Sequence, residues 1–328
     1  MENADFIFKE KALEIIRNKT ALVICGGGVL GTALLGSLGK LVDLGMPLNK
    51  IKSITGSSVG SIIGTAIAAG ASYSYINNKV NSLNFTEFVD RSCILVQGAR
   101  LIKNYGLHKT DKISEFISEI LSELLGNADI TFKDLYDLTG THLTVTYLSL
   151  NYEKTMYADY INEPNSLVRE AVVKSCSIPV FFEANFEKKE GLTFVDIDGG
   201  TQNNYPMNVP RNQQIDPINI IGLKLISPKD MTDSENGGND PLINFGPPRN
   251  VIDYLKRVIS ILREQAMRIH VSDNDWMLTV KINIEKYTST DFNLTEKDKI
   301  TLAGFGQDAV TSYVNELTNL LKTQKFPY

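Results

Sequence analysis

Hydrophobic positions along the chain fall into short apolar runs followed by stretches with helical spacing. Residues 21–25 form an apolar run that ends at three consecutive glycines, which is typical of a strand buried on both faces. In residues 29–44, leucines recur at spacings of three and four until a glycine and a proline end the pattern, as in a helix. A second apolar run at 51–55 passes through a glycine-rich turn into a helix of small and apolar residues at 61–69. Two strand–turn–helix units in succession predict a parallel sheet with right-handed crossovers.

The remaining pattern predicts further strands, amphipathic helices and one long loop. Helices are predicted at 1–19, 112–125, 251–269 and 307–321, and strands at 142–149, 155–159, 192–197, 218–226 and 276–284. Residues 227–250 are polar and rich in Gly and Pro, which predicts a surface loop long enough to act as a lid. No repeat or linker divides the sequence, so we expect one domain spanning 1–328. Its predicted class is α/β, with three layers (α/β/α) around a mostly parallel central sheet.

Charge and cysteine content narrow the class of protein. With 33 basic and 38 acidic residues, the net charge of −5 excludes an electrostatic nucleic-acid binder. Three scattered cysteines, Cys25, Cys93 and Cys176, favour buried thiols in a reducing compartment over a disulfide framework. Residues 1–19 lack the apolar core of a signal peptide, and the longest uncharged apolar run, 61–71, is shorter than the roughly 20 residues of a spanning helix. We expect a cytoplasmic protein that reaches a membrane only peripherally.

A G-x-S-x-G sequence joins the second predicted strand to its helix. Ser58 is the central serine, and Gly56 and Gly60 remove side chains that would clash with a tight turn. A serine on such a turn adopts a strained backbone conformation and exposes its hydroxyl, so Ser58 is the candidate nucleophile. The alternative is a glycine-rich turn without a catalytic role.

The glycine run after the first strand predicts an anion site. Amides at the start of a helix are unpaired and electropositive, and the anion is either a nucleotide phosphate or the oxyanion of an acyl-transfer intermediate. Gly26, Gly28 and Gly31 satisfy the G-x-G-x-x-G spacing of dinucleotide sites, but the second strand ends in the serine turn and not in a ribose-binding acid. An oxyanion hole at Gly26, Gly27 and Gly28, with Gly31 supporting the turn, accounts for both glycine-rich segments.

A base for the serine must come from few candidates. The sequence has three histidines, His108, His142 and His270, and only His270 follows the order Ser, Asp, His of common α/β hydrolases. Asp198 is the stronger candidate, because it ends a predicted strand and is followed by Gly199 and Gly200, which allow close approach. Burial would raise its pKa enough to accept a serine proton, and we expect the like charge of Asp196 to act in the same direction.

These motifs together resemble the patatin-like phospholipases. The resemblance rests on Gly26 to Gly31, on Ser58 in G-x-S-x-G, on Asp198-Gly-Gly with Asn204 and Pro206 after it, and on Ser175-Cys-Ser-Ile-Pro179, and it spans roughly 22–206. It implies that Ser58 attacks an ester carbonyl, that Asp198 takes and returns the proton without a histidine, and that amides around Gly27 and Gly28 hold the oxyanion. It also implies an acyl-enzyme, a released fatty acid, and no metal or cofactor.

The predicted function is therefore a lipid acyl hydrolase of the phospholipase A or lysophospholipase type. Two alternatives stay open: a serine esterase or acyltransferase with a Ser58–Asp198–His270 triad, and a non-enzymatic nucleotide- or phosphate-binding module that uses Gly26 to Gly31. The expected partner is a phospholipid or another lipid ester, with peripheral membrane contact and no nucleic acid. A protein activator, the preferred headgroup and the acyl position are not readable from the residues.

Overall fold

The structure is a computed structural model, and it describes residues 2–89, 92–226, 247–251 and 271–328 apart from 286, together with 253–255, 257–259 and 261. Most of the predicted loop at 227–250 lies outside the described residues, and so does His270. Of the predicted helix at 251–269, the described positions from 251 to 261 are helical.

A single large sheet organises the molecule. Its strands are β1 (Ala21–Ile24), β2 (Ser53–Ser57), β4 (His142–Ser149), β5 (Lys154–Ala158), β7 (Asn185–Lys189), β8 (Leu192–Asp198), β9 (Ile220–Ile226) and β10 (Thr279–Asn283). The strand order is β10-β9-β1-β2-β4-β8-β7, with β5 also paired to β4. The strands from β10 to β4 are parallel, whereas β5, β7 and β8 are joined by antiparallel pairings. The predicted α/β class with a mostly parallel central sheet is confirmed.

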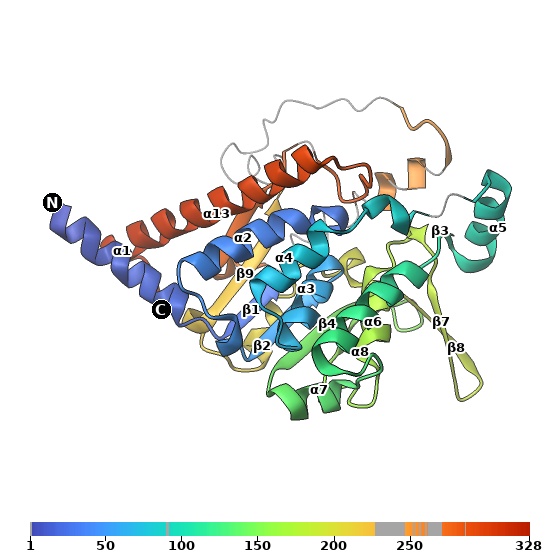
Figure 1. Cartoon of the computed structure of the whole chain (residues 1–328), viewed down its shortest axis with the longest axis horizontal. Coiled ribbons are helices and arrows are strands. Elements are labelled where there is room, and N and C mark those ends of the chain that lie inside the picture. The colour runs from blue at the N-terminus through green and yellow to red at the C-terminus, as the bar shows by residue number, and fades with distance from the viewer. Residues whose placement is uncertain are drawn as a thin grey trace.

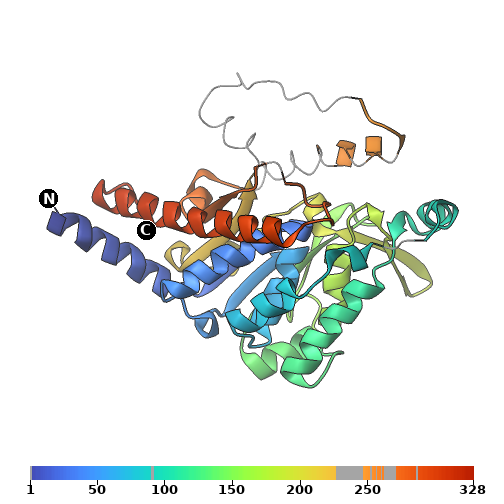
Figure 2. The ribbon, with the colours of Figure 1, turned by 45° about the horizontal axis from the view of Figure 1, so that its top comes forward.

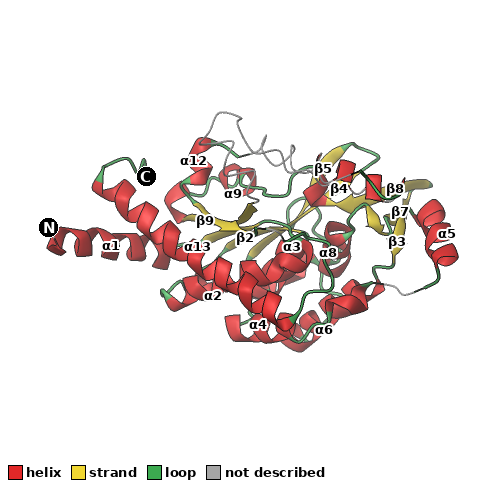
Figure 3. Ribbon diagram, turned by 90° about the horizontal axis from the view of Figure 1, so that it is seen from above, coloured by secondary structure: helices red, strands yellow, loops and turns green. Residues whose placement is uncertain are grey.

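Helices cover both faces of the sheet. The crossovers from β1 to β2 and from β2 to β4 contain α2 (Gly31–Asp43) and α3 (Val59–Ala68), and right-handed crossovers that step in the same direction place their helices on one face. The long helix α13 (Glu296–Lys322) packs against α2 on this face. Figure 3 shows the short helices α9 (Asn208–Asn212) and α12 (Asp273–Trp276) on the opposite side of the sheet.

The other elements surround this core. They are α1 (Glu2–Arg17), α4 (Tyr73–Asn81), α5 (Ile94–Asn104), α6 (Asp111–Leu125), α7 (Phe132–Thr139), α8 (Val168–Cys176), the 3₁₀ turns η1 (Gly28–Leu30), η2 (Leu48–Lys50), η3 (Phe85–Phe88), η4 (Gly199–Thr201) and η5 (Pro217–Asn219), and a second sheet of β3 (Gly106–His108) with β6 (Val180–Phe182). Helix α1 lies at one end of the molecule and α5 protrudes at the other (Figures 1 and 2).

Three expectations from the sequence differ from the structure. The last helix begins at Glu296, well before the predicted residue 307, because Thr295 and Asp298 form a capping box that starts it earlier. The last strand begins at Thr279, since a second capping box, at Ser272, makes the preceding residues helical. The prediction of buried thiols holds for Cys25 and Cys176 but is wrong for Cys93, which is exposed at the start of α5.

The strand order defines where a ligand would bind. Strand β1 lies between β2, which follows it in the chain, and β9, which is reached only after the whole β4–β8 region. In open α/β sheets, ligands bind outside the carboxyl ends of the strands where the connections diverge in this way. The glycine run after β1 and the serine turn after β2 both lie at this edge.

Candidate active site

Ser58 occupies the sharp turn between β2 and α3. Its backbone has φ 51° and ψ −128°, a conformation that costs a residue with a side chain roughly 1–3 kcal/mol. Two hydrogen bonds hold it there: the Ser58 N–H donates to the Ser175 hydroxyl at 2.8 Å, and the Ser61 hydroxyl donates to the Ser58 carbonyl at 2.6 Å. The strained turn that the sequence predicts is present, but the predicted exposure of the serine is wrong: Ser58 is 2% exposed, because it lines an apolar cavity and does not face solvent.

The glycines of the serine turn are required by close packing. A Cβ on Gly60 would overlap the carbonyl of Ile24 at the end of β1. A Cβ on Gly56 would meet the backbone of Gly60 and Ser61, and one on Gly31 would meet the side chain of Val59. These contacts bring α3 against both β1 and the start of α2, so that the serine turn and the glycine run pack together.

The glycine run is held from two sides. The Gly26 N–H donates to the Asn204 carbonyl at 3.2 Å, and the Asn204 side-chain amide donates to the Gly26 carbonyl at 3.0 Å. A Cβ on Gly26 would approach the Ser58 Cβ to 2.9 Å, so this backbone lies directly beside the serine. On the other side, the Val29 N–H donates to the Ser289 carbonyl at 3.2 Å, next to Gly28 with its left-handed φ of 53°. A side chain would fit at neither Gly26 nor Gly28.

Asp198 ends β8 and is completely buried. It pairs with Tyr147 of β4, and its N–H donates to the Ser177 carbonyl at 2.9 Å. The Gly200 N–H donates to the Asp198 Oδ1 at 2.6 Å, which orients the carboxylate. Gly199 lets the chain turn here, because a Cβ at that position would overlap the Thr146 carbonyl.

The Cys176 thiol lies where these segments meet. Burial raises its pKa and the charge of Asp198 raises it further, whereas hydrogen bonds with the Ser61 and Ser58 hydroxyls lower it. The two neighbours of Cys176 also hold the site together: Ser175 accepts a hydrogen bond from the Ser58 N–H, and Ser177 accepts one from the Asp198 N–H.

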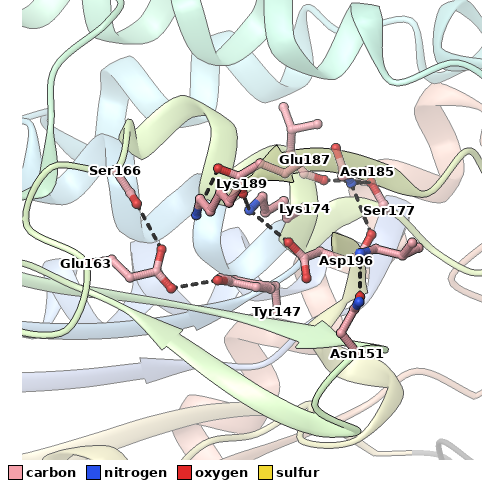
Figure 4. Close-up of polar contacts among 12 residues, drawn as sticks. Tyr147, Asn151, Glu163, Ser166, Lys174, Ser177, Asn185, Glu187, Lys189 and Asp196 are labelled. Atoms are coloured by element: carbon pink, nitrogen blue, oxygen red, sulfur yellow. Dashed lines mark hydrogen bonds and ion pairs between the residues drawn. The ribbon is translucent and has the colours of Figure 1, made fainter. Parts of the chain in front are cut away.

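Asp196 has a different environment from the one expected. Its carboxylate is buried and lies 2.8 Å from the Lys174 ammonium, which also contacts Glu187 at 2.8 Å, and Figure 4 shows this network beside β8. Burial by itself would lower the pKa of Lys174, but the charges and hydrogen bonds of Asp196 and Glu187 raise it overall. Lys174 thus compensates the Asp196 charge that we expected to act on Asp198.

The described histidines have other surroundings. His142 opens β4 beside Ser53, roughly 16 Å along the strand from Ser58, and its ring lies 3.3 Å from Asp159. His108 belongs to the second sheet, and its ring packs on Phe181 with 4.7 Å between centroids. His270 lies outside the described residues, so the triad that includes it stays a prediction.

An apolar cavity opens beside Ser58. It has a volume of about 80 Å³ and runs from Gly28 and Ser58 between α3, α4, α6 and η3. Among the described residues that line it, Ser58 and Cys176 are the only ones whose side chains carry a heteroatom. A second, smaller cavity of about 10 Å³ continues along α3, and the two share Ile62, Ile63, Val80 and Phe116.

Some residues of the site were not singled out from the sequence. Ser175 and Asn204 lie in quoted motifs, but the motifs alone do not say that one fixes the serine turn and the other the glycine run. From the sequence, Cys176 is predicted only as a buried thiol, and its position in the first of these motifs does not link it to the site. Ser289 carries no local signal at all, because its role arises only when the chain returns to Gly28 after more than 250 residues.

Comparison with known proteins identifies the family. Residues 22–210 match the family model described as patatin-like phospholipase, so the chain belongs to this family and is a lipid hydrolase. YqhO of Bacillus subtilis is 25% identical over 306 residues, which cover 90% of this chain and 98% of YqhO. Triacylglycerol lipase ptl3 of Schizosaccharomyces pombe is 29% identical over 201 residues, which cover 58% of this chain but only 41% of the lipase.

The fold also has a counterpart among solved structures. VipD from Legionella pneumophila matches with a TM-score of 0.59 at 14% identity, covering 91% of this chain and 67% of VipD. This likeness concerns the fold alone. Among the helices that the structure describes, none has the length and hydropathy needed to cross a bilayer.

Proposed function

We propose that this protein hydrolyses carboxylic esters of phospholipids or lysophospholipids, with Ser58 as nucleophile and Asp198 as general base. The observation that carries the proposal is that one short segment, Ser175 to Ser177, binds the backbone amides of both the strained Ser58 and the fully buried Asp198, beside a cavity with an almost purely hydrocarbon lining. A histidine base is not part of the proposal.

The proposed reaction has two half-reactions. The Ser58 Oγ attacks the ester carbonyl carbon while Asp198 accepts the hydroxyl proton. The ester C–O bond then breaks, and Asp198 returns the proton to the departing alcohol of the lysophospholipid or glycerol derivative. Water attacks the acyl-enzyme with Asp198 again as base, which releases the fatty acid and restores the Ser58 hydroxyl.

We propose that the oxyanion hole consists of two backbone amides, those of Gly27 and Gly28. The Gly26 N–H already donates to Asn204, so its part is to hold the loop. Within the described part of the chain, no acceptor is assigned to the amides of Gly27 and Gly28. Both lie at the start of η1, where backbone amides favour negative charge, and they are the donors we propose for the oxyanion.

The cavity supports an acyl chain as the group bound beside Ser58. Hydrocarbon surface gains free energy when it leaves water for such a lining. Its walls would position an ester carbonyl at the Ser58 end and leave the polar headgroup outside.

Triacylglycerol is a second candidate substrate. The relatives from Schizosaccharomyces pombe, Saccharomyces cerevisiae and Arabidopsis thaliana are named triacylglycerol lipases, with 28–31% identity over a part of each protein. Because an acyl chain beside Ser58 is common to both substrate classes, the cavity does not separate them.

Mass spectrometry of a mixed lipid extract tests the proposal and separates the substrates. The wild-type protein should release free fatty acid and deplete one lipid class, and Ser58→Ala and Asp198→Asn should do neither. Ser53→Ala is a matched control, because it removes a buried hydroxyl from the other end of the same strand. Fatty acid release by the Ser58→Ala protein would contradict the proposal.

A further inference from the structure

Helix α5 presents an apolar face to solvent. Leu95 is 81% exposed and Ile102 is 82% exposed, and the exposed Ala99 lies between them at spacings of four and three. These positions share one side of a helix. Single exposed hydrophobic residues are ordinary, but a whole outward helix face of this kind marks an interaction surface.

The position of α5 accounts for this exposure. The apolar positions of α6, such as Ile113, Phe116 and Ile117, point into the core, whereas α5 protrudes at the end of the molecule (Figures 1 and 2). The exposed apolar surface continues onto β7, where the rings of Tyr105 and Phe186 lie 5.5 Å apart.

The charge on α5 differs from that of the whole chain. The helix contains Arg100 and Lys103 and no acidic residue, although the net charge of the protein is −5. An amphipathic helix with an apolar face and only basic charges matches the interface of a bilayer that contains anionic lipid. A protein interface of ordinary composition would not need this charge asymmetry.

The segment before α5 lines the cavity, and the segment after α5 pairs with a strand that does. Phe85 and Phe88 of η3, which precedes α5 in the chain, line the cavity. Strand β3 follows α5 and pairs with β6, and Phe182 of β6 lines the cavity as well. A lipid surface bound at α5 would therefore lie beside the cavity that opens at Ser58.

We infer that α5 docks the protein on a lipid bilayer, with Leu95, Ala99 and Ile102 entering the interface and Lys103 facing anionic headgroups. The inference rests on the proposed function for its purpose, since only an enzyme acting on membrane lipid gains from this placement. Docking itself is measured without turnover.

Sedimentation with vesicles of phosphatidylcholine and phosphatidylglycerol tests the docking. The double variant Leu95→Ser, Ile102→Ser should bind these vesicles roughly tenfold or more weakly, because two large apolar side chains no longer leave water. The control pair Leu138→Ser and Ile300→Ser, also exposed but on α7 and α13, should bind as the wild type does. Lys103→Glu should weaken binding to these vesicles and leave binding to pure phosphatidylcholine unchanged.

Cys93 provides a site for a dye that reports the docking of α5 on vesicles. It is exposed at the start of α5, whereas Cys25 and Cys176 are buried, so an environment-sensitive thiol dye attaches there. Its fluorescence should shift to the blue with vesicles in the wild type and not in the double serine variant.

Two results would overturn the inference. One is vesicle binding by the double serine variant equal to that of the wild type. The other is self-association of the wild type, measured by light scattering, that the double serine variant loses while its binding to vesicles stays the same. The proposed function is tested separately with the soluble ester p-nitrophenyl butyrate, and it fails if no Ser58-dependent turnover of this ester is measured. The double serine variant should hydrolyse this ester as fast as the wild type does.

Discussion

Ionisable groups are buried at both ends of the parallel strands, but their surroundings differ between the two ends. At the amino end, Lys19 is fully buried and donates to the Ile218 carbonyl at 2.7 Å, and His142 lies 3.3 Å from Asp159. At the carboxyl end, the buried Asp198 and the strained Ser58 are bound by one segment, Ser175 to Ser177, beside a cavity. Burial of charge therefore does not distinguish the candidate active site. What distinguishes it is the combination of backbone strain, excluded side chains and an adjoining cavity.

The largest expected effect is on catalysis, and it separates the two ends. Ser58→Ala and Asp198→Asn should each lower kcat/KM on a soluble ester by about 10⁴-fold or more, because a nucleophile and its base act as one unit. His142→Ala at the amino end should change kcat/KM by less than about tenfold. Circular dichroism should show that all three variants are folded. A loss of activity in His142→Ala as large as that in Ser58→Ala would contradict the placement of the active site at the carboxyl end of the strands.

The second prediction concerns the pH dependence of stability at the amino end. Burial lowers the pKa of Lys19 from 10.5 to about 7, against a smaller opposing effect of Asp216. Between these values the unfolded chain binds more protons than the folded one, so the free energy of unfolding should rise with pH from 7 towards 10.5. The whole rise is on the order of 5 kcal/mol at most.

Urea denaturation at pH 7 and pH 9 measures this rise. Lys19→Met should remove most of its pH dependence, and Lys52→Met, at an exposed position nearby, should keep it. An unchanged pH dependence in Lys19→Met would show that another group is responsible.

A smaller effect on stability is expected from the packed glycines. Gly60→Ala forces a methyl group against the Ile24 carbonyl and should lower the free energy of unfolding by roughly 1–3 kcal/mol, with loss of activity. Gly304→Ala, in the interior of α13 with open space around it, should raise it by about 0.5–1 kcal/mol. Thermal unfolding of both variants tests the contrast, which fails if Gly60→Ala is as stable as the wild type.

The smallest expected effect is on acyl-chain preference. Phe116 lines both cavities, so Phe116→Ala should join them and shift the preferred p-nitrophenyl ester from octanoate towards palmitate by a few-fold, on the order of 1 kcal/mol. Ile120→Ala is the matched control, because Ile120 lines only the smaller cavity. Equal shifts in the two variants would mean that Phe116 does not separate the cavities.

Local features of the fold were predictable from the sequence, and long-range ones were not. The strand–turn–helix units around Gly26 and Ser58 follow from hydrophobic periodicity and glycine placement, which act over a few residues. The contact of Asn204 with Gly26 and that of Ser289 with Val29 depend on chain segments that meet only in the folded state. The compensation of Asp196 by Lys174 is of the same kind, because no spacing rule relates a helix residue to a strand more than twenty residues later.

The central claim is that Ser58 is the nucleophile, and active-site labelling tests it most directly. A fluorophosphonate probe should add its mass to the peptide that contains Ser58 in the wild type, because only an activated serine hydroxyl reacts readily. Asp198→Asn should label far more slowly, and Ser58→Ala not at all. Absence of an adduct on the wild-type peptide, or an adduct of equal yield in Ser58→Ala, would contradict the account.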